Sequence, residues 1–140
     1  MSFRRAESSN NVDTDEFLIG MLNSPKDLEV IEVGDLKTSD NSKEGYQYFH
    51  IRIRDIETSE AVKLSFNVKV NNDNSLYIGQ GAKFYPLASY VSHIRNEAII
   101  CFKEDIDEAL NGLTFKAKSI RKKFGRKPYF VLVPIGQGDE

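Results

Sequence analysis

Two neighbouring segments of the chain alternate apolar and polar residues, and this alternation constrains the fold more than any other feature. They are "YQYFHIRIRDI" (46–56) and "AVKLSFNVKV" (61–70). A period of two places successive side chains on opposite faces of a strand, and one apolar face with one polar face is typical of half-buried antiparallel sheets. The sequence therefore predicts adjacent antiparallel strands over 46–54 and 62–70. The side chains expected to be buried together are Phe49, Ile51, Leu64 and Phe66.

Weaker patterns predict the other elements. An N-cap residue predicts a short helix from Thr14 to Leu22, and a proline suited to a first helical turn predicts a second helix from Pro86. A third short helix is expected from Lys103, with acids in its first turn and a glycine just past its end. Further strands are expected over 28–39, where Gly34 indicates a bulge or sharp bend, and over 97–102, 113–120 and 128–135.

Length and composition indicate one folded domain. The chain has 140 residues, of which 40% are hydrophobic and 29% are charged, as in soluble globular proteins. We expect a flexible arm with a short helix over 1–25, a domain over 26–136 and a short flexible tail over 137–140. The sequence shows neither a membrane-spanning run nor a signal peptide, and its single cysteine, Cys101, cannot form an intramolecular disulfide. These features predict a cytoplasmic protein without a membrane partner.

Positive charge is concentrated near the end of the chain in "RKKFGRK" (121–127), which we call the basic segment. Five of its seven residues are Lys or Arg, although the formal net charge of the chain is −2. Neighbouring cations repel one another, so an anion is expected to compensate them. Phe124 lies among these cations, and Lys116 and Lys118 extend the charge along the preceding strand. A mobile, solubilising hairpin tip is the alternative explanation.

The polar face of the strand expected over 46–54 also combines aromatic and cationic residues. With the next strand, this face contains Tyr46, Tyr48, His50, Arg52, Arg54, Lys63 and Lys69. Bases stack on aromatic rings while Lys and Arg neutralise the phosphates, so such a face suits a single nucleic-acid strand. Tyrosine also favours strands for its own packing, and arginine keeps an open face soluble, so this face alone leaves both explanations open.

The expected order of three strands, a helical segment and two strands is that of the OB-fold, a mainly β, five-stranded Greek-key barrel. Over residues 28–135 the chain resembles small phage-type single-stranded DNA-binding proteins of the OB class in element order and charge placement. The resemblance implies an OB-like barrel with short helices between strands 3 and 4. It also implies a ligand surface formed by strands 2 and 3, the loop over 38–45 and the basic segment. The end of the chain, "IGQGDE", lacks the long acidic tail with which bacterial members recruit partners.

Together these features predict a protein that binds single-stranded nucleic acid, DNA before RNA, with little sequence specificity and without catalysis. The sequence contains no recognisable catalytic set, metal site or cofactor motif. The alternative is an interaction or assembly module that docks an acidic protein through the basic segment, and homo-oligomer formation stays open. The residues expected to bind nucleic acid are Tyr46, Tyr48, His50, Arg52, Lys63, Lys69, Lys116, Lys118, Arg121, Lys122, Lys123, Phe124, Arg126 and Lys127.

Overall fold

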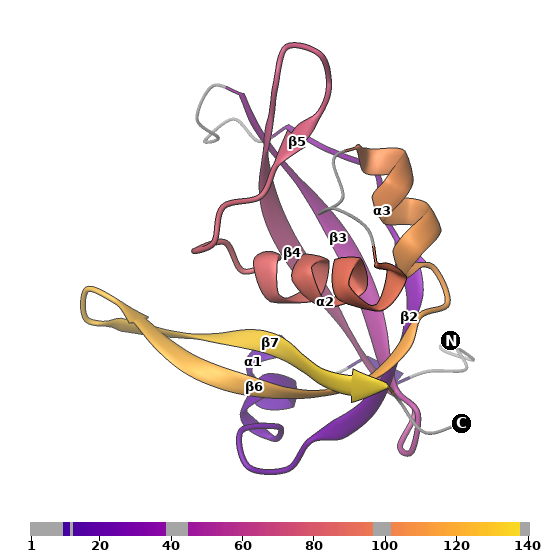
Figure 1. Ribbon diagram of the computed structural model, residues 1–140. Coiled ribbons are helices and arrows are strands. Elements are labelled where there is room, and N and C mark those ends of the chain that lie inside the picture. Colours follow the sequence, from indigo (N-terminus) through magenta and orange to yellow (C-terminus); the bar gives the residue numbers. More distant parts are fainter. Residues whose placement is uncertain (1–9, 12, 39–44, 97–101, 138–140) are drawn as a thin grey trace, which may run out of the picture.

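One curved sheet with three short helices makes up the fold (Figure 1). The computed structural model describes residues 10–11, 13–38, 45–96 and 102–137. The helices are α1 (Thr14–Ile19), α2 (Tyr85–Arg95) and α3 (Lys103–Leu110). The strands are β1 (Asn10–Asn11), β2 (Lys26–Val33), β3 (Tyr46–Asp55), β4 (Glu60–Val70), β5 (Leu76–Tyr77), β6 (Thr114–Phe124) and β7 (Lys127–Gln137).

Six strands form an antiparallel sheet in the order β5–β4–β3–β2–β6–β7. β1 adds a two-residue parallel pairing at the beginning of β4. The pairing of β3 with β4 confirms the prediction from alternation, because Phe49 lies opposite Phe66 and Ile51 lies opposite Leu64. All four side chains are buried.

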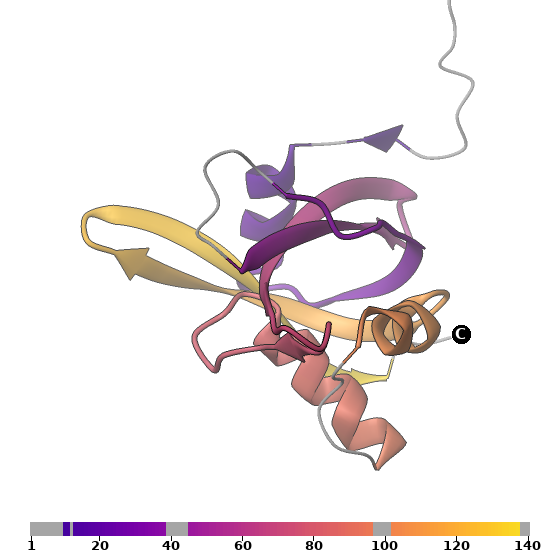
Figure 2. The same ribbon diagram turned by 90° about the horizontal axis from the view of Figure 1, so that it is seen from above.

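The sheet does not close, so the predicted five-stranded OB-like Greek-key barrel is wrong. Closure would require β7 to pair with β4. Within the described ranges, β7 pairs only with β6, and the far edge of β4 pairs only with the short β1 and β5. We call the opening between the β4 and β7 edges the seam. Figure 2 shows β2, β3 and β4 curling round while the β6–β7 hairpin projects away from them.

Helix α1 gives a physical reason why the seam stays open. It packs against both β4 and β7. The Thr14 hydroxyl donates a hydrogen bond of 3.3 Å to the Lys63 carbonyl. In a closed sheet this carbonyl would instead accept from a backbone N–H of the neighbouring strand. The helix therefore takes up part of the space and part of the backbone edge that a direct β4–β7 pairing needs.

The core combines one face of the sheet with apolar side chains from all three helices. Phe49, Phe66 and Phe84 form an aromatic cluster whose ring centroids lie 5.1 to 5.9 Å apart. The helices contribute buried Phe17, Leu18, Leu87, Ala88, Val91, Ile106 and Leu110. The opposite face of β3 and β4 is left to solvent, and we call it the outer face.

Helix α1 is present as predicted, but with a different cap and a shorter length. The N-cap is Asp13 rather than Thr14. The Asp13 carboxylate accepts a hydrogen bond of 3.1 Å from the Glu16 backbone N–H. The helix ends at Ile19 instead of Leu22. α2 and α3 lie where the sequence predicted them, with Pro86 in the first turn of α2.

Some predictions fall on residues outside the described ranges. The strand expected over 97–102 is one of them, because residues 97–101 are not described. The same holds for most of the 38–45 loop, for residues 1–9 of the arm and for residues 138–140 of the tail.

Strand β2 is shorter than predicted, and its irregularity lies elsewhere. Its register with β3 shifts between Val30 and Glu32, before Gly34 is reached. Gly34 donates its backbone N–H to the His50 carbonyl at 2.7 Å, and a Cβ at this position would lie 3.3 Å from that oxygen. Close approach of two backbones therefore explains the glycine better than a bulge does.

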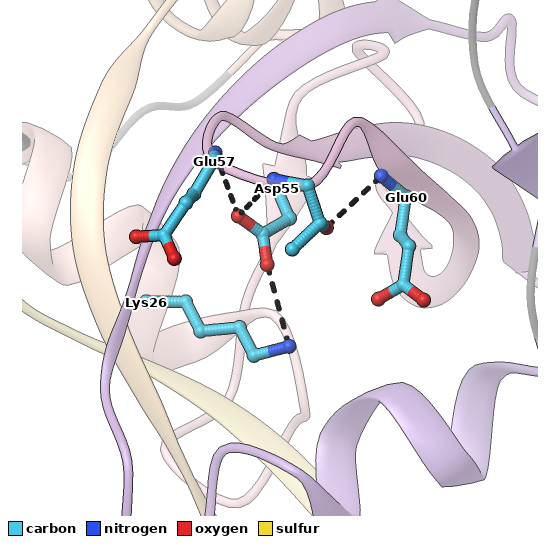
Figure 3. Close-up of polar contacts among 5 residues, drawn as sticks. Lys26, Asp55, Glu57 and Glu60 are labelled. Carbon is cyan, nitrogen blue, oxygen red and sulfur yellow. Dashed lines mark hydrogen bonds and ion pairs between the residues drawn. The ribbon is translucent and has the colours of Figure 1, made fainter.

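A buried carboxylate fixes the turn between β3 and β4 (Figure 3). Asp55 is only 3% exposed. Its carboxylate accepts hydrogen bonds from the backbone N–H groups of Glu57 (2.9 Å) and Thr58 (3.3 Å) and lies 3.3 Å from the Lys26 ammonium. These contacts compensate the cost of burying the charge and connect the start of β2 to the β3–β4 turn.

The basic segment is a β-hairpin rather than a loop. β6 extends to Phe124 and β7 begins at Lys127, so only Gly125 and Arg126 form the turn. Gly125 has a φ of 65°, which glycine adopts at little cost in a two-residue hairpin turn. Because the segment is mostly strand, its side chains alternate between two faces.

Candidate functional site

The outer face carries three residues that the strand register places side by side. Lys69 of β4 lies opposite Tyr46 of β3 on one side and opposite Tyr77 of β5 on the other. Residues paired in an antiparallel ladder project from the same face of the sheet. Tyr46 is 39% exposed and Tyr77 is 61% exposed, so both rings are open to solvent. The result is a tyrosine–lysine–tyrosine row across three strands.

A second row runs beside the first. Lys37 pairs with Tyr48 through two backbone hydrogen bonds of 2.8 and 2.9 Å, and Asn67 lies opposite Tyr48 on β4. His50 is next on this face of β3, opposite Ser65. We call the following residues the aromatic patch: Lys37, Tyr46, Tyr48, His50, Lys69 and Tyr77. Among the described residues, no acid occupies a position that the register pairs within these rows.

The environment of His50 favours its neutral form. Its ring lies edge-on to that of Tyr48, with centroids 5.4 Å apart. Its Nδ1 atom is buried and has no hydrogen-bond partner among the described residues. Burial, and to a lesser extent the charges of Lys63 and Lys37, lowers the pKa of His50. The aromatic patch therefore offers His50 at neutral pH as an uncharged ring whose protonation state an anion would change.

The other end of the outer face is charge-balanced, and here the structure separates residues that the sequence grouped together. The guanidinium Nη1 of Arg52 lies 3.8 Å from the carboxylate Oε1 of Glu32 on β2. Lys116 of β6 lies opposite Asp27 of β2. Lys118 projects from the same side of β6 and is exposed. An acid beside a cation offsets its attraction for phosphate, so Arg52 and Lys116 are weaker candidates than the aromatic patch.

The β6–β7 hairpin divides the cations of the basic segment between its two faces. On one face Lys122 lies opposite Tyr129, and on the other Arg121 lies opposite Phe130 and Lys123 opposite Pro128. The exposed side chains of the segment are Arg121, Lys122, Lys123, Arg126 and Lys127. The side chain of Phe124 lies outside the described part of the structure, so its role stays a prediction.

The seam contains a cavity of about 390 Å³, which we call the seam cavity. Its walls come from β4, from β7, from α1 and from Lys83, which follows β5 in the chain. Lys63 and Lys127 line it from opposite strands, and Asp15 is its acidic lining residue. Because Lys63 also belongs to the outer face, the edge of β4 connects the aromatic patch to the seam.

A second, more open hollow of about 380 Å³, the outer pocket, adjoins the seam cavity. It is lined by Gly81, Lys83, Lys127 and Tyr129, and the last three of these also line the seam cavity. The Lys83 ammonium lies 5.4 Å from the centroid of the Tyr129 ring. Tyr129 therefore lies where the two hollows meet. Three lysines from separate segments line these hollows with it: Lys63 of β4, Lys83 of the connection after β5 and Lys127 of β7.

Four residues of this surface were missed by sequence reasoning: Lys37, Tyr77, Lys83 and Tyr129. Tyr77 had a usable signal, because it alternates with the buried residues Leu76 and Ile78. Lys83 had none, because a lone lysine in a glycine-containing connection indicates nothing about its neighbours.

Neither a metal site nor a membrane span emerges from the part of the chain that the structure describes. There, no three His, Cys, Asp or Glu side chains gather in a way that could hold a metal ion. The described helices are also too short and too polar to cross a bilayer. No family model, curated protein or solved structure matches the chain.

Proposed function

We propose that the chain binds single-stranded nucleic acid, DNA before RNA, with little sequence preference, across the aromatic patch. The observation that carries this proposal is the row of Tyr46, Lys69 and Tyr77. Two exposed rings with an ammonium between them match the repeating chemistry of a single strand, in which bases alternate with phosphates. Base–aromatic stacking contributes about 1–3 kcal/mol per base, while the cation releases counterions from the phosphate.

A single strand suits this surface better than a duplex does. The rings of Tyr46 and Tyr77 offer flat apolar faces, which only an unstacked base can use. In a duplex both faces of each base are already stacked, so only the lysines would contribute. A duplex is therefore expected to bind more weakly than an oligo-dT strand of equal length.

An acidic protein partner accounts for less of the surface. Docking through charge needs cations alone, and it gives no reason to align exposed tyrosine rings with a lysine between them. The basic segment serves either ligand, so it does not discriminate between them. The aromatic patch discriminates between the two ligands, because its tyrosine rings can stack bases but add nothing to docking through charge.

Ring removal at the aromatic patch tests the proposal. Tyr46→Ala and Tyr77→Ala should each weaken the binding of fluorescein-labelled oligo-dT by about 5- to 150-fold, the equivalent of one lost stack. The matched controls are Tyr46→Phe and Tyr77→Phe, which keep the ring and should bind nearly as well as the unmodified chain. If the alanine variants bind oligo-dT normally, the aromatic patch is not the binding surface. If the chain binds polyglutamate as tightly as oligo-dT, the protein-docking alternative replaces this proposal.

A further inference from the structure

The described edge of β4 pairs with a short strand at each end and with no strand between them. β1 pairs with Glu60 and Ala61, and β5 pairs with Lys69 and Val70. The Lys63 carbonyl points toward the seam, because it accepts from the Thr14 hydroxyl. Backbone groups alternate in direction along an antiparallel strand, so the N–H and C=O of Ser65 point the same way. The seam cavity therefore has a donor and an acceptor on its β4 wall.

The β7 wall supplies an aromatic ring and positive charge. Tyr129 borders both hollows, and Lys122 lies directly opposite it on β6. Lys63, Lys83 and Lys127 form no ion pair with an acid among the described residues. Among the described lining residues, the one carboxylate belongs to Asp15, which lines the seam cavity but not the outer pocket. The outer pocket is thus the more favourable place for an anion.

We propose that the seam holds one nucleotide of the bound strand, a site that rests on the proposed function and extends it. The base enters the seam cavity and stacks against Tyr129, with its polar edge facing the Ser65 backbone. The phosphate lies in the outer pocket between Lys83 and Lys127. The strand reaches this site from the aromatic patch over Lys63 at the β4 edge. Both hollows have volumes in the range of small-ligand pockets, roughly 300–1,000 Å³.

This site adds a second reason for single-strand selectivity. A base can enter a cavity between two strand edges only if it is unpaired and unstacked. Extracting one base from a duplex requires its pairing and stacking to be broken, whereas a base in a single strand is already unpaired. The selectivity of the chain for oligo-dT over duplex is therefore expected to depend on the seam as well as on the aromatic patch.

A tryptophan reporter tests the seam site directly. The chain contains no tryptophan, so Tyr129→Trp places a single indole between the two hollows. Titration with oligo-dT should quench its fluorescence, because a stacked base contacts the ring. The charge-removing variant Lys83→Met, made in the Tyr129→Trp background, should shift the titration to higher oligo-dT concentration. It should also reduce the magnitude of the log–log salt slope by about 0.7, the value for one phosphate contact on a single strand.

A second pair of variants keeps the test valid if the reporter perturbs the seam. Tyr129→Leu should weaken oligo-dT binding by about 5- to 150-fold, whereas Tyr129→Phe keeps the ring and should bind normally. The outcomes separate the two proposals. If oligo-dT binds and depends on Tyr46 and Tyr77, but the indole of the Tyr129→Trp variant is not quenched and Tyr129→Leu and Lys83→Met bind normally, the seam site is wrong and the proposed function stands. If oligo-dT does not bind the unmodified chain, both are wrong.

Discussion

The Lys83 ammonium lies 5.4 Å from the centroid of the Tyr129 ring and so joins the connection after β5 to strand β7 across the seam. A cation over an aromatic face stabilises a partly exposed site by about 0.5–1 kcal/mol. The contact holds Tyr129 at the meeting point of the two hollows before any ligand arrives. It also makes Lys83 a cation that a phosphate can attract at little cost, because no described carboxylate competes for it.

Two adjacent lysines of the basic segment should behave differently. Lys122 projects from the hairpin face that carries Tyr129, whereas Lys123 projects from the opposite face beside Pro128. Lys122→Ala should weaken oligo-dT binding and reduce the magnitude of the log–log salt slope by about 0.7. Lys123→Ala removes the same charge from the same strand and should change the slope less. Anisotropy titrations at several salt concentrations measure the affinity and the salt slope of each variant. Equal effects would mean that the hairpin acts only through its total charge.

Removing an acid should strengthen binding. The Glu32 carboxylate lies 3.8 Å from the Arg52 guanidinium on the outer face and offsets its positive charge. Glu32→Gln should increase the affinity for oligo-dT and make the log–log salt slope steeper by up to about 0.7, because Glu32 then no longer offsets the attraction of Arg52 for a phosphate. The control is Glu57→Gln, which changes the net charge equally at an exposed turn position. If both variants bind alike, Arg52 contributes nothing specific.

The lowered pKa of His50 predicts two opposite effects of acid. Burial and the nearby charges of Lys63 and Lys37 hold the pKa of His50 below its usual value of 6.5 in the folded chain. Below that pH the unfolded state binds more protons than the folded state does. The free energy of unfolding should therefore fall as the pH decreases through the range between the unfolded and folded pKa values. Urea unfolding at a series of pH values measures this, and His50→Gln should flatten the profile.

Binding should change in the other direction. A phosphate near His50 favours the charged imidazolium, so oligo-dT affinity should rise as the pH falls below 6.5. His50→Gln should remove this rise and keep the rest of the affinity. An identical pH dependence in the variant would place the phosphates away from His50.

The turn between β3 and β4 should matter for stability alone. Asp55 is buried, accepts two backbone hydrogen bonds and pairs with Lys26. Asp55→Ala leaves the donors of two part-buried hydrogen bonds and the Lys26 ammonium without their acceptor, which should cost about 1–3 kcal/mol in the free energy of unfolding. Lys26→Met tests the ion pair separately. Chemical denaturation measures both, and oligo-dT affinity at low denaturant should stay unchanged.

The sequence predicted the local elements well because their signals are local. Alternation over 46–54 and 62–70 was enough to establish the β3–β4 pair and its buried face. The sequence pattern underestimates the lengths of β6 and β7, because a run of cations is more typical of a loop than of a strand. In a β-hairpin such residues are tolerated when they project into solvent on both faces.

Closure of the sheet was the error, and it concerned a contact that neither alternation nor helix periodicity encodes. Whether β7 pairs with β4 depends on where α1 packs, and helix periodicity does not specify the packing partner. One feature of the sequence does favour an open sheet. Pro128 and Pro134 lack an N–H and are tolerated mainly at a sheet edge, so two prolines in one strand favour an unpaired edge over a closed barrel.

A fluorescence-anisotropy titration of the unmodified chain with labelled oligo-dT, oligo-rU and duplex DNA at two salt concentrations tests single-strand binding most directly. We expect oligo-dT to bind more tightly than duplex of equal length, oligo-rU to bind less tightly than oligo-dT, and affinity to fall as salt increases. We also expect Tyr77→Ala to narrow the gap between oligo-dT and duplex. Duplex binding as tight as oligo-dT binding, with no effect of Tyr77→Ala, would contradict single-strand binding across the aromatic patch.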